Sequence, residues 1–236
     1  MRRSLAFAFA GALMTTTVAS ASKPATSNVW SGYVATGATF TSVVASWIQP
    51  NVTCPVANAR ASFWVGFDGA GNGTVEQDGT IAVCTAVNSP PTYRAWWEMI
   101  TKSGKRGKEP FTISPGDVIV ASVRYDGGTY ALEVQDLTSG RTLNSNQTCT
   151  PACSRSSAEW IAERPGSGKY PLAEYGAVTF SGAFAGTTGG SRSISTGGYR
   201  KMKMVNHVTK KTLSVPSVLA PDSHGTTFTV LWKAAQ

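Results

Sequence analysis

Short runs of alternating hydrophobic and polar residues recur along the chain, separated by glycine, proline, asparagine and serine. Alternation with a period of two is typical of strands with one buried face, and no stretch beyond the first 21 residues shows the period of an ordinary helix. The predicted strands are Trp30–Thr36, Ser42–Ile48, Ala61–Phe67, Thr74–Val83, Tyr93–Ile100, Asp117–Tyr125, Tyr130–Leu137, Ala158–Glu163, Gly176–Ser181, Tyr199–Val205 and Thr226–Trp232.

These strands follow one another without a compositional break or a fixed repeat, and Asp126-Gly127-Gly128 is a strong hairpin signal between two of them. The pattern predicts an all-β fold, a two-sheet antiparallel β-sandwich of the jelly-roll kind. We expect residues 22–236 to form a single domain.

Two of the predicted strands place a tryptophan and a carboxylate on the face opposite their apolar one. Trp64 shares a face with Asp68, and Trp96 shares a face with Glu98. Such a face suits the floor of a substrate groove, because tryptophan offers a wide apolar contact and lowers the dielectric around an acid. Half-exposed aromatic residues beside ordinary surface acids are the simpler alternative.

The first 21 residues have the features of a secretory signal. Arg2 and Arg3 precede an apolar run from Leu5 to Met14, and Ala19-Ser20-Ala21 supplies small residues for cleavage. The apolar run is too short to anchor the chain in a bilayer. We therefore expect a secreted protein whose mature chain begins near Ser22, without a membrane partner.

Four cysteines in a chain with an export signal predict two disulfides. Three pairings are possible; Cys149 and Cys153 are close enough to close a turn, and Cys54 with Cys84 would then bracket the strand pair that carries Gln77. A metal site is disfavoured because both histidines lie far downstream of the cysteines. We expect neither a metal nor a cofactor.

The chain is mildly basic. It has 21 basic and 13 acidic residues, and excluding Arg2 and Arg3 leaves a net charge of about +6. Basic residues gather at 102–108, 200–203 and 210–211, which could follow a nucleic-acid backbone, but solvated loops and lysines on edge strands explain them more simply. We expect no nucleic-acid partner.

The remaining candidates for chemistry are carboxylates and amides. Serine catalysis would need His207 or His224 as its base, and neither lies in a recognisable arrangement. The acids near tryptophan or within the strands described above are Asp68, Glu76, Glu98, Glu159 and Glu163. Two of them could form a glycosidase, and one of them with an amide could activate water; the pattern alone leaves both open.

Several short motifs in register resemble those of the glutamic peptidases, the eqolisin family of secreted acid proteases. The resemblance runs from Ser27 to Gly182 in family order. The matching segments are Ser27-Asn28 with Trp30–Gly32 (WSG), Phe63–Gly69 (FWVGFDG), Thr74–Gly79 (TVEQDG), Tyr93–Glu98 (YRAWWE), Gly116-Asp117 and Ala158–Glu163 (AEWIAE).

The resemblance implies a catalytic pair, Gln77 and Glu163, on a concanavalin-like sandwich. Glu163 would take a proton from water, and Gln77 would position that water and stabilise the oxyanion. The residues that the resemblance places around the groove are Trp30, Trp64, Asp68, Trp96 and Glu98. It further implies acid cleavage of proteins or peptides without a metal or cofactor, and we expect a monomer.

Two alternatives and one departure accompany this interpretation. A glycoside hydrolase using Glu98 and Glu163, or a non-catalytic sandwich that binds carbohydrate or peptide, would also fit the pattern. Arg164 follows Glu163 where fungal members of the family carry an acid, and we expect its charge to favour the ionised carboxylate.

Overall fold

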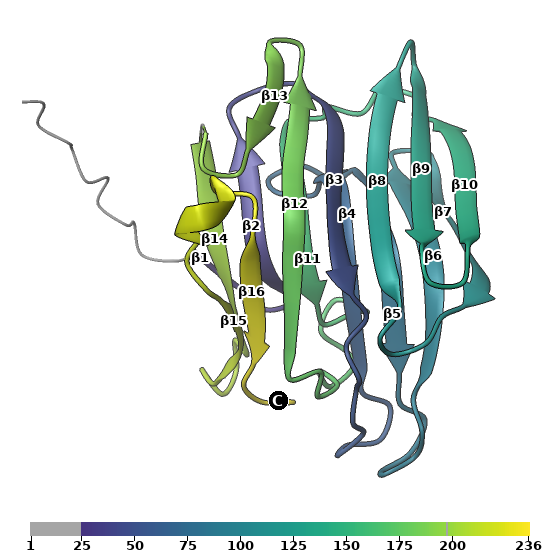
Figure 1. The fold of residues 1–236 in the computed structure, drawn as a ribbon, viewed down its shortest axis with the longest axis vertical. Coiled ribbons are helices and arrows are strands. Elements are labelled where there is room, and N and C mark those ends of the chain that lie inside the picture. Colours follow the sequence, from purple (N-terminus) through teal and green to yellow (C-terminus); the bar gives the residue numbers. More distant parts are fainter. Residues whose placement is uncertain (1–24, 197) are drawn as a thin grey trace, which may run out of the picture.

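The computed structural model describes residues 25–196 and 198–236, and the predicted export signal lies outside this range. The described chain consists almost entirely of β-strands, with a single short 3₁₀ turn at Pro221–Ser223 (Figure 1). No helix in the described residues has the length and apolarity needed to cross a membrane.

The described residues form sixteen strands, of which fourteen lie on one continuous hydrogen-bonded path and two pair beside it. In chain order they are β1 (Ala25–Ser27), β2 (Trp30–Thr36), β3 (Phe40–Ile48), β4 (Arg60–Asp68), β5 (Val75–Val83), β6 (Thr92–Thr101), β7 (Gly104–Thr112), β8 (Val118–Asp126), β9 (Thr129–Asp136), β10 (Arg141–Thr148), β11 (Ser157–Glu163), β12 (Ala177–Thr187), β13 (Gly190–Ser193), β14 (Gly198–Val205), β15 (Thr212–Pro216) and β16 (Phe228–Trp232).

The path folds over on itself into two layers (Figure 1). One layer has the order β10-β9-β8-β3-β12, and the other has the order β14-β2-β11-β4-β5-β6-β7, with β16 and β15 joining them along one side. All pairings are antiparallel apart from that of β1 with β14. The prediction of an all-β, two-layer antiparallel sandwich is confirmed.

All the strands predicted from alternation are present, and five strands were missed: β1, β7, β10, β13 and β15. Polarity explains the two longest of these. β7 is exposed along most of its length and β10 alternates weakly, because each is an edge strand with little apolar surface to bury. Alternation detects strands through their buried face, so it cannot detect strands that lack one.

The alternating faces of β4 and β6 are divided as predicted. Phe63, Val65 and Phe67 of β4 lie in the main core between the layers, together with Tyr93, Ala95, Trp97 and Met99 of β6. Trp64 lies on the opposite face, where it packs with Val34 and Ile161 in a separate small cluster. The outer face of this layer therefore carries aromatic side chains of its own.

The basic segment at 102–108 contributes Lys105, Arg106 and Lys108 to β7, an edge strand, as the simpler explanation of this segment predicted. Arg106 Nη2 donates to the carbonyl oxygen of Thr148 across the open side of the sandwich (2.6 Å). Arg141 Nη1 of β10 donates in the other direction, to the carbonyl oxygen of Thr112 (3.3 Å). The two edge strands are thus tied to each other at both ends.

Both predicted disulfides are present: Cys54 pairs with Cys84, and Cys149 pairs with Cys153. The first joins the segment before β4 to the end of β5, and both of its cysteines are buried. It therefore closes a loop of 30 residues around the two strands that carry Trp64 and Gln77.

Replacing both Cys54 and Cys84 by alanine is expected to lower the free energy of unfolding by about 3 kcal/mol, since the bridge restricts the unfolded chain. Urea denaturation followed by tryptophan fluorescence measures the change. The same replacement of Cys149 and Cys153, which are only 4 residues apart, is expected to have a smaller effect, and an equal effect of the two would contradict the loop-length argument.

Candidate active site

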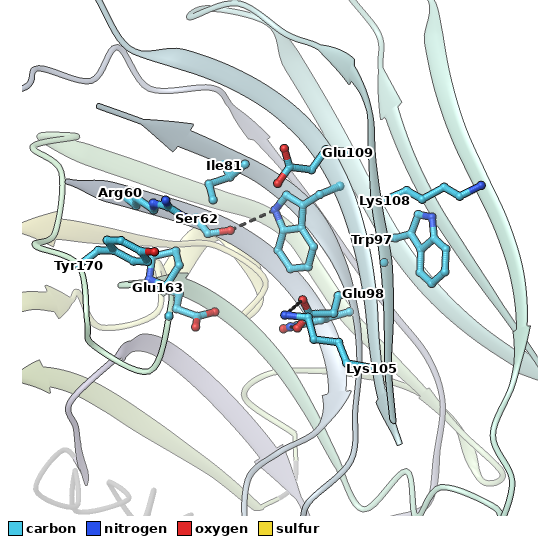
Figure 2. A pocket seen from close by; sticks show the side chains of 15 residues that line it. Arg60, Ser62, Ile81, Trp97, Glu98, Lys105, Lys108, Glu109, Glu163 and Tyr170 are labelled. Atoms are coloured by element: carbon cyan, nitrogen blue, oxygen red, sulfur yellow. Dashed lines mark hydrogen bonds and ion pairs between the residues drawn. The ribbon is translucent and has the colours of Figure 1, made fainter. Parts of the chain in front are cut away.

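A groove crosses the outer face of β11, β4, β5 and β6. Its first cavity has a volume of about 650 Å³ and is lined by side chains from these strands, from β7 and from the segment 165–170 (Figure 2). A second cavity of about 770 Å³ is lined by residues 26–30, the loop 69–71 and part of β14. Gln77, Glu98, Lys105 and Glu163 line both cavities, so these residues lie where the two meet.

Glu163, the last residue of β11, is held by an indole. Trp64 Nε1 donates to Glu163 Oε2 at 2.6 Å, and Trp64 itself is fully buried. The ring of Trp30 stands edge-on to that of Trp64, with 5.2 Å between the ring centroids. One carboxyl oxygen of Glu163 is therefore fixed by a rigid aromatic pair.

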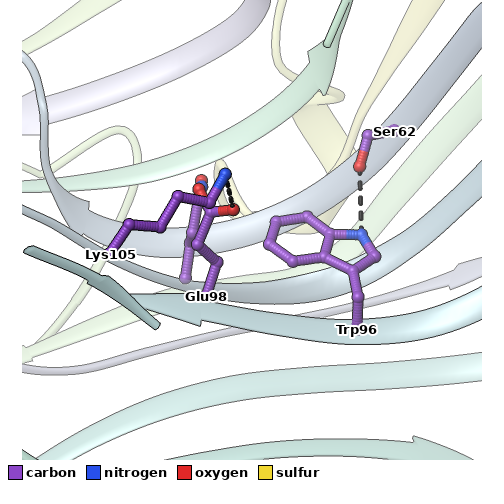
Figure 3. A network of polar contacts seen from close by, with 5 residues as sticks. Ser62, Trp96, Glu98 and Lys105 are labelled. Atoms are coloured by element: carbon purple, nitrogen blue, oxygen red, sulfur yellow. Dashed lines mark hydrogen bonds and ion pairs between the residues drawn. The ribbon is translucent and has the colours of Figure 1, made fainter. Parts of the chain in front are cut away.

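Gln77 lies on β5 opposite Gly66 of β4 and Glu98 of β6. A Cβ at position 66 would lie 2.9 Å from Gln77 Cβ, so glycine there leaves room for the amide side chain. Gln77 Nε2 donates to Glu98 Oε1 (3.2 Å), and Lys105 Nζ lies 2.5 Å from Glu98 Oε2. Glu98 thus orients the amide, and Lys105 neutralises the charge of Glu98 (Figure 3).

Trp96 of β6 also lines the first cavity. Its Nε1 donates to Ser62 Oγ at 3.1 Å (Figure 3). Ser62 Oγ in turn donates to the carbonyl oxygen of Thr80 (2.9 Å). Gly79 lies opposite both Trp64 and Trp96, and a Cβ there would approach the Trp64 Cα to 2.7 Å. The glycine allows the strands to pass closely under the two indoles.

Asp68, like the fully buried Trp64, is a predicted groove residue that lines neither cavity. It is buried at the end of β4 with a positive φ of 66°, and its carboxylate accepts hydrogen bonds from the backbone N–H groups of Arg155 and Ser156 (2.7 and 2.8 Å). Its two oxygens also accept from Asn72 Nδ2 and Thr74 Oγ1. Asp68 ties the loop after β4 to the segment before β11, and so supports the groove from outside it.

The structure separates Glu163 from Glu159, which sequence parity placed on one side of the strand. Glu159 is fully buried and lines neither cavity, whereas Glu163 lines both. Burial raises the pKa of Glu159 well above its ordinary value. Glu76 also lies outside the cavities; it is buried, and its pKa is raised to about 9, first by burial.

The environment of Glu163 favours the protonated carboxyl group in acid, and not the ionised carboxylate that the sequence led us to expect. Its pKa is raised to about 7, chiefly by burial. The Trp64 hydrogen bond lowers this pKa, the negative charge of Glu98 raises it and the positive charge of Lys105 lowers it. Glu163 therefore carries a proton at acidic pH.

The expected influence of Arg164 on Glu163 was wrong. Arg164 is buried, its Nη2 donates to Asn28 Oδ1 at 3.0 Å, and it is not among the groups that shift the pKa of Glu163. Successive residues of a strand point to opposite faces, which separates the two neighbouring side chains. Lys105 supplies the nearby positive charge instead.

Sequence reasoning missed several residues that line the first cavity: Arg60, Ser62, Lys105, Glu109 and Tyr170. Lys105 was counted only as part of a basic segment. Arg60 and Tyr170 come together because the segment 171–173 runs beside the start of β4. No local motif signals such a contact.

The described residues contain one group of potential metal ligands, formed by Glu76, Cys149 and Cys153. Both sulfurs of this group are joined in a disulfide. A disulfide sulfur has no thiolate to offer, so this group does not fit a metal site.

Comparisons with known proteins agree with this architecture. The model of the peptidase A4 family matches residues 28–225. Scytalidoglutamic peptidase, solved with a peptide-based transition-state analogue, is 23% identical with a TM-score of 0.71 over 87% of this chain and 98% of the other. SCP-B, described as an eqolisin and solved with the tripeptide Ala-Ile-His, is 22% identical with a TM-score of 0.69 over 87% and 98%.

Aspergilloglutamic peptidase from Aspergillus niger is 26% identical with a TM-score of 0.60, over 74% of this chain and 99% of the other. Among curated protein sequences, none matches the chain significantly. The family match covers most of the chain, from the strand that carries Trp30 to beyond the last residue of the groove. The chain therefore belongs to the peptidase A4 family, the glutamic peptidases or eqolisins.

Proposed function

We propose that this glutamic peptidase is a secreted endopeptidase that works in acid through Gln77 and Glu163. The observation that carries the proposal is that both side chains line both cavities, each held by a neighbour: Glu163 by Trp64 and Gln77 by Glu98. Cavities on both sides of the pair would let a peptide extend in either direction, as an endopeptidase requires.

Addition of water uses the proton that Glu163 carries in acid. The water oxygen bonds to the scissile carbonyl carbon, the carbonyl oxygen gains the Glu163 proton, and the ionised carboxylate takes the proton that the added water releases. The product is a neutral diol with Glu163 protonated again. Glu163 thus activates the water and still enters the reaction as an acid.

Gln77 contributes the hydrogen bonds that favour this step. One Nε2 hydrogen is donated to Glu98, and the second is available to the oxygen on which negative charge develops. Because an amide donates at any pH and is held in advance by Glu98, its hydrogen bond stabilises the transition state without reorganisation.

Breakdown of the diol reverses the roles. Glu163 gives its proton to the amide nitrogen, the C–N bond breaks, and a hydroxyl of the diol returns a proton to Glu163. The products are a carboxylic acid and an amine. A glycoside hydrolase would instead need Glu98 as a free carboxyl group, but Glu98 is paired with Lys105 and accepts from Gln77.

Secretion is part of the proposal. Two disulfides favour an oxidising compartment, and the first 21 residues have the composition of an export signal.

The test is a pH profile of kcat/KM for a fluorogenic peptide and for denatured casein, measured with a metal chelator and an aspartic-protease inhibitor present. We expect cleavage in acid, with a kcat/KM that stays constant below the Glu163 pKa of about 7. Above this pKa, kcat/KM should fall about tenfold per pH unit. Fluorescence at each pH restricts the analysis to folded protein.

Two outcomes would contradict the proposal. If kcat/KM rises about tenfold per pH unit from pH 4 towards 7, ionised Glu163 is the reacting form. The proposal that Glu163 begins the reaction protonated would then be wrong. If no protein or peptide is cleaved at any pH while a glucan or xylan is hydrolysed, the peptidase mechanism itself is wrong.

A further inference from the structure

Arg60 lies in the first cavity and has no part in the proposed chemistry. Its backbone is fixed on two sides. On one side it pairs with Val83 of β5. On the other side its N–H donates to the carbonyl oxygen of Pro171 (2.9 Å), and its carbonyl oxygen accepts from the N–H of Ala173 (3.0 Å). Figure 2 shows Arg60 beside Ser62 and Tyr170, on the side of the cavity away from Glu98 and Lys105. The side chain therefore projects from a rigid base.

The guanidinium of Arg60 lies over the ring of Tyr170, with 3.7 Å from Cζ to the ring centroid. Tyr170 is itself packed on Gly166, where a Cβ would approach the ring to 2.8 Å. Stacking of this kind occupies the flat face of the guanidinium and leaves its edges, with their N–H donors, free to bind in the plane. Arg60 is thus oriented in advance for a planar acceptor.

No acid compensates Arg60 within the described chain. The ion pairs there are Arg94 with Glu109 and Lys105 with Glu98, so the two other carboxylates that line this cavity beside Glu163 already have cations of their own. Arg60 Nε is buried and donates no hydrogen bond to any described acceptor. A partly buried cation without an acceptor is costly, and an anion that enters the cavity would relieve this cost.

We propose that Arg60, stacked on Tyr170, forms a subsite for a carboxylate of the bound peptide. The planar fork of a guanidinium matches a carboxylate with two parallel hydrogen bonds. The carboxylate of the bound peptide belongs either to an aspartate or glutamate side chain or to a free C-terminus. This inference rests on the proposed function, because the ligand is a peptide lying along the groove.

The test compares pairs of fluorogenic peptides that differ only by glutamate or glutamine at one position, scanned on both sides of the cleaved bond. A second set compares a free C-terminal carboxylate with its amide. At pH 5.5 a peptide carboxylate is ionised and Glu163 keeps its proton. We expect the charged member to have a kcat/KM higher by about tenfold or more at one position, as for a charge-assisted hydrogen-bond pair.

Arg60→Gln is expected to bring this ratio close to one, and Arg60→Lys, which keeps the charge but loses the planar fork, to lower it in part. Lys108→Gln is the matched control, because Lys108 lines the same cavity from β7; it should leave the ratio unchanged. At pH 3 the ratio should fall for the unmodified protein, since the peptide carboxylate is then protonated.

Binding separates a failure of this subsite from a failure of the proposed function. The same peptide pairs are titrated against the Glu163→Gln protein by calorimetry, a measurement that needs no cleavage. Tighter binding of the charged peptide that Arg60→Gln abolishes supports the subsite even if no peptide is cleaved. Equal binding and cleavage of both members of every pair, or a preference that survives Arg60→Gln and Arg60→Lys, would overturn it.

Discussion

Glu163→Gln is expected to lower kcat/KM by about 10²–10⁴-fold, the range associated with loss of a positioned proton donor and acceptor. A glutamine has the shape of glutamate and its amide oxygen can still accept from Trp64 Nε1, now 2.6 Å from Glu163 Oε2. The fold and the groove should therefore be kept. What is lost is the proton that Glu163 gives and takes back.

Glu159→Gln is the matched control for this change. Glu159 lies on the same strand and is fully buried, but it lines neither cavity. Because burial keeps its carboxyl group protonated, a neutral amide of the same shape should replace it without loss of kcat/KM. Both variants are assayed on one peptide after circular dichroism has established that each is folded. Normal activity of Glu163→Gln, or equal loss in both variants, would contradict the assigned role.

Gln77→Ala belongs to the same experiment. Removal of one donor to a developing oxyanion typically lowers kcat by about 10²–10³-fold, and here it also leaves Glu98 with Lys105 as its partner. A normal kcat in this variant would show that the amide has no part in the transition state.

Much of the fold and part of the site could be predicted from the sequence because both depend on local periodicity. Alternation in β4 and β6 divided core from groove correctly, placing Phe63 inside and Trp64 and Trp96 outside. It could not place Asp68 or detect β7. Asp68 leaves the alternation because its backbone turns to a positive φ, and β7 buries almost no side chain.

The choice of Glu163 over Glu159 shows a different limit. Both residues have the same parity, so periodicity ranked them equally and only the family resemblance separated them. In the structure, Glu159 is fully buried between β2 and β4, while Glu163 at the strand end lines both cavities. The burial of Glu159, like the approach of Tyr170 to Arg60, depends on contacts that no local pattern encodes.

The protein is expected to be most stable in acid and to lose stability as the pH rises above about 4 to 5. Burial raises the pKa of Glu76 to about 9 and raises the pKa values of Asp78 and Glu159 well above the ordinary range. In the unfolded chain these acids titrate near pH 4. Above that pH the unfolded chain releases protons that the folded chain keeps, so the free energy of unfolding falls.

The carboxyl group of Glu76 lowers the free energy of unfolding by about 1.4 kcal/mol per pH unit until its folded pKa of about 9 is reached. Asp136 has the opposite sign: its pKa is lowered although burial opposes this, because Ser139 and Thr138 donate hydrogen bonds to it. Its contribution to the free energy of unfolding is lost only as the pH falls below the ordinary pKa of an aspartate. It therefore leaves the decline between pH 5 and 9 unaltered.

Urea denaturation at pH 4, 5.5 and 7, followed by tryptophan fluorescence, measures this decline. Glu76→Gln and Glu159→Gln should each flatten this decline, because an amide has no proton to release when the chain unfolds. A free energy of unfolding that stays constant or rises from pH 4 to 7 would contradict the raised pKa values. If the free energy of unfolding declines equally in Glu76→Gln, Glu159→Gln and the unmodified protein, other groups cause the decline.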